Sequence, residues 1–282
     1  MANTIYWGQA AVENTNGFGK SATNNTIDFG EVCANSLSPE TNLTGTGATP
    51  SFSNTQSIEL DGMDAYVDCN SAASSISADN EGTISVWVNP NDISSNQTIL
   101  NFSASTQTRQ YLILNLSSSL GFTIDMRTTS NSSSGFIVYA NVNPFSVGAW
   151  THLAIVQNGV SPQLYVDGVA VAQTFLVSTN DQKWLNDMAS FDTINIGRIF
   201  TSDLDQNYFD GLVDEVSYFS SALSSTDIET IYNNGVPNDI SSLSPVSWWR
   251  FEGTGTTAID SGTGGNDGVL DNTVVRSTDV PT

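Results

Sequence analysis

Two acidic residues near the start of the regular part of the sequence have the spacing of a catalytic acid and base. Glu59 and Asp61 stand two positions apart in SIELD, and a β-strand turns every second side chain toward the same face. Two carboxyl groups on one face can cleave a glycosidic bond, one acting as the acid and the other as base or nucleophile. Asp64 adds a third carboxylate in the adjoining turn. Polysaccharide hydrolysis is therefore the first chemistry that these residue types suggest.

Other residues that could carry out catalysis are scarce. The chain has one histidine and two cysteines, whose spacing is unlike that of zinc ligands. It has no GxSxG motif and no glycine-rich phosphate loop before a helix. His152 lies in the apolar run AWTHLAIV, so we expect a packed strand residue. Nothing in the sequence requires an enzyme, and a non-enzymatic protein is predicted.

Carbohydrate binding would need aromatic rings and planar polar groups on a loop rim. Trp184 lies in the longest polar insertion, within DQKWLNDM, and Tyr208 lies in LDQNYFDG. Either ring could form a platform for a sugar, because an aromatic side chain combines an apolar face with a polar edge. The alternative, and the more common role, is that each ring anchors its own loop.

The charge of the chain excludes several kinds of partner. The formal net charge is −22, from 29 acidic and seven basic residues. Such a surface repels nucleic acid and anionic membranes, so we expect neither partner. No apolar run approaches the roughly 20 residues that span a bilayer. Cys33 and Cys69 either pair or remain free buried thiols, and the second alternative is favoured.

The elements that must position these residues are short strands. From residue 57 onward, apolar and polar residues alternate in short runs bounded by turn residues. Repeated runs of this kind predict an antiparallel sandwich or jelly roll. The predicted strands are residues 57–61, 65–69, 83–90, 98–103, 111–116, 121–127, 135–141, 150–157, 163–168, 193–199 and 212–219.

One helix is predicted in the segment ALSSTDIETIYNNG. Ser224 can cap its start, and Asp227 can complete a capping box. Ile228 and Ile231 then share a face, and Gly235 can close the end of the helix in a left-handed conformation.

Five segments in consistent order resemble the laminin G-like, concanavalin A-like jelly-roll superfamily. They are SIELDGMDAYVDC, GTISVWVNP, GAWTHLAIVQNG, QLYVDGVAV and FDGLVDEVSYFSSALSSTDIETIYNNG, which together cover about residues 57–236. In the fourth segment, Asp167-Gly168 is a two-residue hairpin turn signal. The resemblance implies an all-β, antiparallel jelly-roll β-sandwich with one short helix.

The resemblance also implies a structural calcium ion, which relatives often hold on backbone carbonyls and Asp or Asn oxygens. The matching positions are Asp61 and Asp64 in LDGMD and Asp214 in GLVDEV. Carboxylates on short loops suit Ca²⁺, although solvated carboxylates that form turns are the alternative. Glucanases of the superfamily carry Glu-x-Asp-x-x-Glu, and this chain has Asp64 as the nearest third carboxylate. A hydrolase is therefore not favoured.

The segment 247–272, SWWRFEGTGTTAIDSGTGGNDGVLDN, resembles the opening strand and loop of such a module but follows the helix. We expect Trp248 to Phe251 to supply an edge strand, either to this jelly roll or to that of a neighbouring subunit. An ordered extension is the alternative. The predicted parts of the chain are an arm (1–36), a linker (37–56), the jelly roll (57–240) and a C-terminal strand and tail (241–282).

An aromatic residue followed by glycine recurs every eleven residues near the start of the chain. The three steps are Trp7-Gly8, Phe18-Gly19 and Phe29-Gly30. About thirty residues cannot bury a core of their own. The repeat therefore predicts burial against the jelly roll, against identical copies or in a larger assembly, and a mobile polar arm is the alternative. We predict that it serves attachment or oligomerisation.

This arm followed by a jelly roll resembles structural proteins of tailed bacteriophages, particularly marine ones. The resemblance implies a virion protein, either a capsid decoration, a fibre or a tail appendage, that forms homo-oligomers and contacts other virion proteins through the arm. The N-terminus MANTIYWGQA lacks the features of a signal peptide, as expected for a virion protein released outside by host lysis. The displayed jelly roll would be a candidate binder of surface glycans. The main alternative is a free extracellular carbohydrate-binding lectin.

Overall fold

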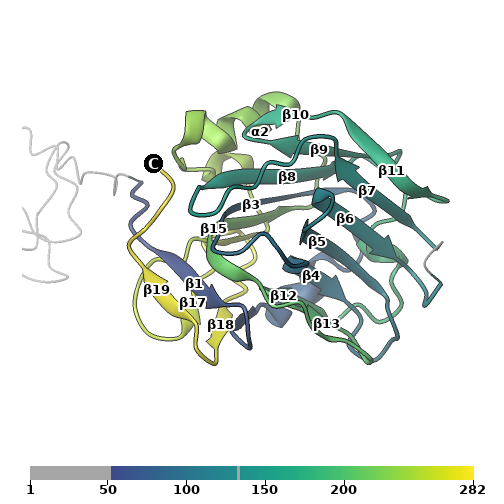
Figure 1. The fold of residues 1–282 in the computed structure, drawn as a ribbon, viewed down its shortest axis with the longest axis horizontal. Helices are drawn as coiled ribbons and strands as arrows, with labels where there is room; N and C mark the ends of the chain where they lie inside the picture. The colour runs from purple at the N-terminus through teal and green to yellow at the C-terminus, as the bar shows by residue number, and fades with distance from the viewer. Residues whose placement is uncertain (1–51, 132–133) are drawn as a thin grey trace, which may run out of the picture. The chain divides into compact units, whose positions relative to one another are not determined.

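Two antiparallel sheets face each other in the computed structural model (Figure 1). The structure describes residues 52–131 and 134–282. Sheet A has the strand order β10-β9-β8-β3-β15-β1-β19, with β16 also paired to β15. Sheet B has the order β11-β7-β6-β5-β4-β12-β2-β18-β17, and β13 and β14 form a separate hairpin. The predicted all-β antiparallel sandwich is confirmed.

The strands of sheet A are β1 (Ser57–Asp61), β3 (Gly82–Pro90), β8 (Thr151–Gln157), β9 (Pro162–Val166), β10 (Val169–Ala170), β15 (Asp210–Phe219), β16 (Ser247–Trp249) and β19 (Val275–Ser277). The strands of sheet B are β2 (Tyr66–Asp68), β4 (Gln97–Ser103), β5 (Tyr111–Ser117), β6 (Gly121–Arg127), β7 (Phe136–Ala140), β11 (Gln173–Ser178), β12 (Thr193–Ile196), β17 (Thr257–Ala258) and β18 (Gly268–Asp271). The hairpin consists of β13 (Ile199–Phe200) and β14 (Asp205–Gln206). The helices are α1 (Ala73–Ile76) and α2 (Ser225–Tyr232), with 3₁₀ turns at Asn70–Ala72, Leu185–Asp187, Asn233–Gly235 and Ser241–Leu243.

The hydrophobic core lies between the two sheets and follows the period of two along each strand. In β3 the inward residues are Ile84, Val86 and Val88, and all three are fully buried. In β5 the inward residues are Leu112, Leu114 and Leu116. Burying one such side chain stabilises the fold by about 1.5–3 kcal/mol, so one polar substitution at these positions would be strongly destabilising.

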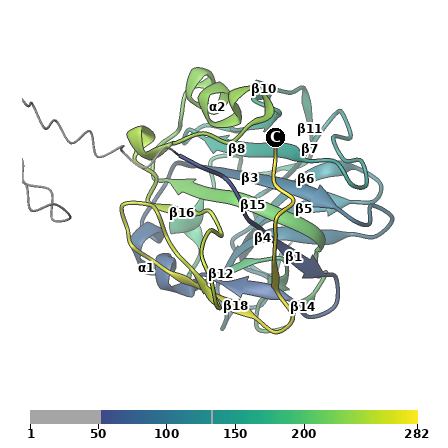
Figure 2. The ribbon, with the colours of Figure 1, turned by 90° about the vertical axis from the view of Figure 1, so that its left-hand side faces the viewer.

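Helix α2 covers part of the outer face of sheet A, beside β10 (Figure 2). The predicted capping box is confirmed, because Ser224 and Asp227 exchange backbone-to-side-chain hydrogen bonds of 3.2 and 3.0 Å. The predicted end is wrong by two residues. Asn233, not Gly235, is the left-handed cap with φ +45°, and Asn is one of the few residues besides Gly that adopt this conformation. Tyr232 stacks on Trp87 with ring centroids 5.6 Å apart, which fixes the helix on the sheet.

The C-terminal segment pairs within the same chain. Strand β16 joins β15 with Trp249 opposite Val216, β18 joins β2, and β19 joins β1. Residues 53–282 form one compact unit. The segment from residue 241 onward therefore adds strands to both sheets of its own jelly roll, which is the first of the two alternatives that the sequence left open.

Most predicted strands are present, with local differences. The Asp167-Gly168 turn joins β9 to β10, with φ values of +49° and +77° that suit this two-residue turn. The predicted strand 193–199 is interrupted at Gly197, where φ is +95°. Strand β11 and helix α1 were not predicted. No helix in the described part of the chain is long and apolar enough to cross a membrane.

Candidate functional site

Polar side chains line the outer face of sheet B, opposite the core. Strand β5 turns Asn115 outward between Leu114 and Leu116, and strand β6 turns Asp125 outward between Ile124 and Met126. The same alternation that builds the core thus builds a polar outer surface.

The hairpin β13–β14 packs against this surface and forms one side of a hollow on it. Ser103 on β4 donates a hydrogen bond of 2.6 Å to the carbonyl oxygen of Phe200. Ile199 packs with Tyr111 and Ile113 in a small apolar cluster on the outer face. Both contacts hold the hairpin against the sheet, so its polar residues face β5 across a gap.

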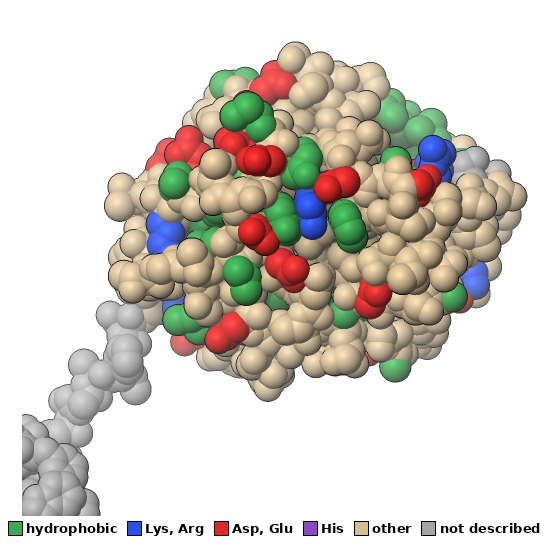
Figure 3. All heavy atoms as spheres, turned by 90° about the horizontal axis from the view of Figure 1, so that it is seen from below, with side chains coloured by type: hydrophobic (Ala, Val, Ile, Leu, Met, Phe, Trp, Pro, Cys, Tyr) green, Lys and Arg blue, Asp and Glu red, His purple; other side chains and the backbone are tan. Residues whose placement is uncertain are grey.

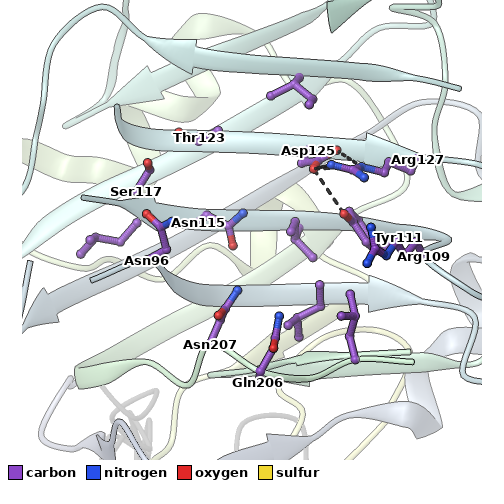
Figure 4. Close-up of a pocket in the computed structure, with 15 residues that line it drawn as sticks. Asn96, Arg109, Tyr111, Asn115, Ser117, Thr123, Asp125, Arg127, Gln206 and Asn207 are labelled. Carbon is purple, nitrogen blue, oxygen red and sulfur yellow. Dashed lines mark hydrogen bonds and ion pairs between the residues drawn. The ribbon is translucent and has the colours of Figure 1, made fainter. Parts of the chain in front are cut away.

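That gap is an open hollow of about 320 Å³. Its side chains come from the loops before β4 and β5, from strands β5, β6 and β7, and from the hairpin and the residue after it (Figure 4). The polar lining residues are Asn96, Arg109, Tyr111, Asn115, Ser117, Thr123, Asp125, Arg127, Gln206 and Asn207. The floor is apolar where Ile113 lies between these polar groups.

A nearly buried ion pair stands at one end of the hollow. Arg127 Nε donates to Asp125 Oδ1 at 2.9 Å, and Arg127 Nη2 donates to Asp125 Oδ2 at 2.6 Å. The Tyr111 hydroxyl donates to the same carboxylate at 3.3 Å, and the guanidinium lies 5.3 Å from the Tyr111 ring centre. Burial raises the pKa of Asp125, although the hydrogen bonds from Arg127 act to lower it. The pair is rigid because each group fixes the other.

Side-chain amides stand at the other end. Asn115 Oδ1 accepts a hydrogen bond of 2.9 Å from Thr98 Oγ1, which leaves the Asn115 NH₂ group available. Gln206 and Asn207 make no side-chain hydrogen bond with any residue that the structure describes, and both point toward β5 (Figure 4). Free amides around one space can bind the hydroxyl groups of a polar ligand.

The structure contradicts the prediction of a sugar platform at Trp184. This side chain is 0 % exposed, and its Nε1 donates a hydrogen bond of 3.1 Å to the hydroxyl of Tyr218. The ring is therefore a loop anchor, the alternative that the sequence left open.

Tyr208 is half-buried, and its hydroxyl donates to Asp205 at 2.7 Å. It follows Asn207 in the chain but does not itself line the hollow. Arg198 pairs with Asp205 at 3.2 Å and lies 3.4 Å from the centre of the Tyr66 ring. A sugar contact by Tyr208 stays a prediction.

The predicted calcium ligands do not come together. Asp61 Oδ1 accepts backbone hydrogen bonds from Met63, Asp64 and Ala65, and Oδ2 accepts a hydrogen bond from the Thr273 hydroxyl group. Burial acts to raise the pKa of Asp61, but these bonds outweigh it and lower the pKa to about 2. The carboxylate therefore closes a turn, as turn-forming Asp residues usually do.

Asp214 lies on β15, the strand paired with β1, but it is not opposite Asp61. Asp61 is opposite Asp210 in the register of β1 and β15, so Asp214 is displaced by four residues, roughly 13 Å at 3.3 Å per residue. In the described ranges, no group of three or more His, Cys, Asp or Glu side chains could hold a metal ion. The set Asp61, Asp64 and Asp214 is therefore wrong as a single site.

The surroundings of Asp214 alone still fit a hard cation. Asp214 is fully buried, and its Oδ2 accepts a hydrogen bond of 2.8 Å from Asn54 Nδ2. The Oδ1 atom of Asn54 and the Oε1 atom of Gln56 are buried without a hydrogen-bond partner among the described residues. Amide oxygens are ligands that Ca²⁺ accepts, and the amide of Asn54 already contacts the Asp214 carboxyl group.

The possible catalytic groups are also engaged elsewhere or isolated. Glu59 is exposed on β1 opposite Leu212 and Val275, and Asp61 is held in its turn. His152 is fully buried, and its Nε2 lies 2.8 Å from Ser85 Oγ, so the prediction of a packed strand residue is confirmed. Cys69 is a buried free thiol.

Several predictions lie outside the described residues. They concern Cys33 and the repeat residues Trp7, Gly8, Phe18, Gly19, Phe29 and Gly30. The lining of the hollow was not predicted at all. Its signal was present as polar residues at alternate positions in YLILNLS and GFTIDMR, which are otherwise apolar.

Comparisons with known proteins agree with the fold. The family model of the concanavalin A-like lectin/glucanases superfamily matches residues 61–229. The CBM40 of the Ruminococcus gnavus IT-sialidase, solved with α2,3-sialyllactose, is 16 % identical with a TM-score of 0.52, over 64 % of this chain and 100 % of that one. A heptameric SAP-like pentraxin from Limulus polyphemus is 14 % identical with a TM-score of 0.54, over 80 % and 95 %. No curated protein matches the chain. Because the family match spans more than half of its length, this chain belongs to the concanavalin A-like lectin/glucanase superfamily.

Proposed function

We propose that the chain is a non-enzymatic protein whose jelly roll binds carbohydrate in the hollow on sheet B. The observation that carries this proposal is the set of free amides at Asn115, Gln206 and Asn207 around a single space. Hydroxyl-rich ligands need several planar polar groups that converge on them, and rigid strands hold these groups in place.

Two further observations support the proposal. The R. gnavus CBM40, a carbohydrate-binding module of the same fold, is described as bound to sialyllactose. The predicted acid and base also have unsuitable surroundings, because Asp61 is locked as a carboxylate and Glu59 faces solvent. A general acid needs a raised pKa, whereas that of Asp61 is lowered to about 2.

A glycan array probed with the full-length protein tests the proposal. We expect binding to a defined group of glycans, and chemical-shift changes on titration that centre on Asn115 and Gln206. An array without signal, or changes centred on another surface, would overturn it. Turnover of any polysaccharide that disappears in Glu59→Gln would instead establish a hydrolase.

We further propose that residues 1–36 attach this jelly roll to the particle of a tailed phage. The support for this proposal is the eleven-residue aromatic-glycine repeat. The family match covers residues 61–229 and therefore does not include the repeat. The partners would be other virion proteins and further copies of this chain, and the protein would work outside the cell after host lysis. A free extracellular lectin is the alternative.

Peptide mass spectrometry across a density gradient of source lysate separates the two. A virion protein peaks with intact particles, and the variant lacking residues 1–36 no longer does so. Recovery of the full chain only among soluble proteins would contradict the phage proposal and favour the free lectin.

We also propose that Asp214, together with Asn54, binds a structural calcium ion. We expect added Ca²⁺ to raise the melting temperature of the wild type, because a ligand that binds only the folded state stabilises it. Asp214→Asn should abolish that rise, and Asp64→Asn should leave it intact. An equal rise in both variants, or none in the wild type, would contradict the site.

A further inference from the structure

We infer that the hollow selects neutral sugars over sugars that carry a carboxylate or sulfate. The inference rests on the proposed function and adds the class of ligand. It follows from the way in which the two arginines of the hollow are already paired.

Arg127 is committed to a partner inside the protein. Its Nε and Nη2 atoms both donate to Asp125, whose side chain is only 11 % exposed. A ligand carboxylate that took over these donors would leave Asp125 buried without its cation. Leaving one member of a mostly buried pair without its partner is strongly unfavourable.

Arg109 also has a partner at the rim. Its Nε lies 3.3 Å from Asp203 Oδ2, and 49 % of its side chain is exposed. Such an exposed ion pair contributes little stability, but the negative charge of Asp203 balances the positive charge of Arg109. Two arginines and two aspartates thus leave the hollow with no net positive charge to attract an anion.

The rest of the molecule opposes anions further. The chain carries a formal charge of −22. Figure 3 shows acidic side chains spread over the face seen from below, with isolated basic ones among them. At physiological ionic strength this repulsion is screened beyond about 8 Å, but Asp125 lines the hollow itself and is in direct reach of a ligand there.

The groups that remain available suit hydroxyls. Asp125 Oδ1 is in good hydrogen-bond geometry with one donor, Arg127 Nε at 2.9 Å, so a lone pair remains to accept from a sugar hydroxyl. The NH₂ groups of Asn115, Gln206 and Asn207 can donate to sugar oxygens. The CBM40 structure holds sialyllactose, which bears a carboxylate, so the shared fold alone does not predict this preference.

The test is an array of neutral oligosaccharides and their sialylated, sulfated and uronic counterparts, followed by calorimetry on the full-length protein. We expect neutral hits whose affinity is insensitive to NaCl, with each acidic counterpart roughly ten-fold weaker or worse. Asp125→Asn should reduce the difference in affinity between neutral and acidic glycans, because it frees Arg127 to bind an anion. Glu229→Gln, which removes an exposed charge on α2, should leave it unchanged.

Failure of the preference for neutral sugars can be told apart from failure of carbohydrate binding itself. Acidic glycans that bind more tightly than their neutral counterparts, with affinity that falls as NaCl rises, would overturn the neutral class and leave carbohydrate binding intact. An array with no signal of either kind would overturn the proposed function and this inference with it. The salt dependence is measured on the wild type, so the result stands even if Asp125→Asn misfolds.

Discussion

Trp184 donates a hydrogen bond of 3.1 Å to the hydroxyl of Tyr218, which in turn donates one of 3.0 Å to Asp79. The three residues belong to the loop after β11, to β15 and to the segment before β3. A Cβ atom on Gly82 would lie 2.9 Å from Trp184 Nε1 and 2.8 Å from Tyr218 Oη. The indole therefore fastens a polar loop to sheet A at a point where only glycine fits.

Substitution of Trp184 should affect stability and not ligand binding. Trp184→Phe keeps an aromatic side chain but removes the N–H and part of the indole, so we expect a loss of about 1–3 kcal/mol of unfolding free energy. Trp184→Ala also leaves a cavity and should cost about 3–5 kcal/mol. Urea unfolding measures both losses. A variant that stays folded but loses glycan affinity would show that Trp184 contacts the ligand after all.

Residues 53–56 should belong to the stable unit even though they precede β1. Thr55 donates two hydrogen bonds of 2.6 Å to Glu252, and Asn54 donates to the buried Asp214. A chain that starts at residue 52 should therefore be more stable than one that starts at residue 57. We expect a difference of about 1–3 kcal/mol, since the shorter chain leaves a buried carboxyl group unsatisfied. Equal urea midpoints for the two truncations would refute this role.

Acid should destabilise the fold through His152. Burial lowers the pKa of this residue to about 3, from an ordinary value of 6.5. Between these values the unfolded chain binds a proton that the folded chain does not, so the unfolding free energy falls as the pH falls. The slope from this group reaches about 1.4 kcal/mol per pH unit.

Two buried carboxyl groups act in the opposite direction. Burial raises the pKa of Glu215 to about 7 and raises that of Asp214 well above its usual range, so their contribution is lost as the pH rises. The contribution of His152 is therefore measured as the difference between wild type and His152→Gln at pH 4 to 7. The variant should gain relative stability as the pH falls. Parallel curves would mean that His152 is not buried as a neutral group.

The sequence predicts the core better than the surface. The alternation in YLILNLS and GFTIDMR places Leu114 and Ile124 inside correctly, because burial requires a fixed period. The same period puts Asn115 and Asp125 outside, but it cannot reveal that the distant hairpin β13–β14 lines the same hollow. Exposed polar positions are common, and only the tertiary structure shows which of them converge.

The errors at Trp184 and Asp214 have related causes. A polar sequence around a tryptophan predicts an exposed loop, yet Trp184 reaches through that loop to Tyr218. Asp61 and Asp214 lie on adjacent strands, as the family order implies, but their register separates them by four residues. The positions of most strands could be predicted from the sequence, whereas their register and the direction of a loop side chain could not.

The most direct test of the account is a pair of double substitutions measured by calorimetry with one glycan from the array. Gln206→Ala with Asn207→Gly removes two free amides from the hollow, with glycine keeping the left-handed backbone of residue 207. Gln182→Ala with Asn186→Ala removes two exposed amides from the loop around Trp184. At about 1 kcal/mol per hydrogen bond, the first pair should weaken binding roughly 30-fold, and the second should leave it unchanged. Unchanged affinity in the first pair, or equal losses in both, would contradict a binding site in the hollow.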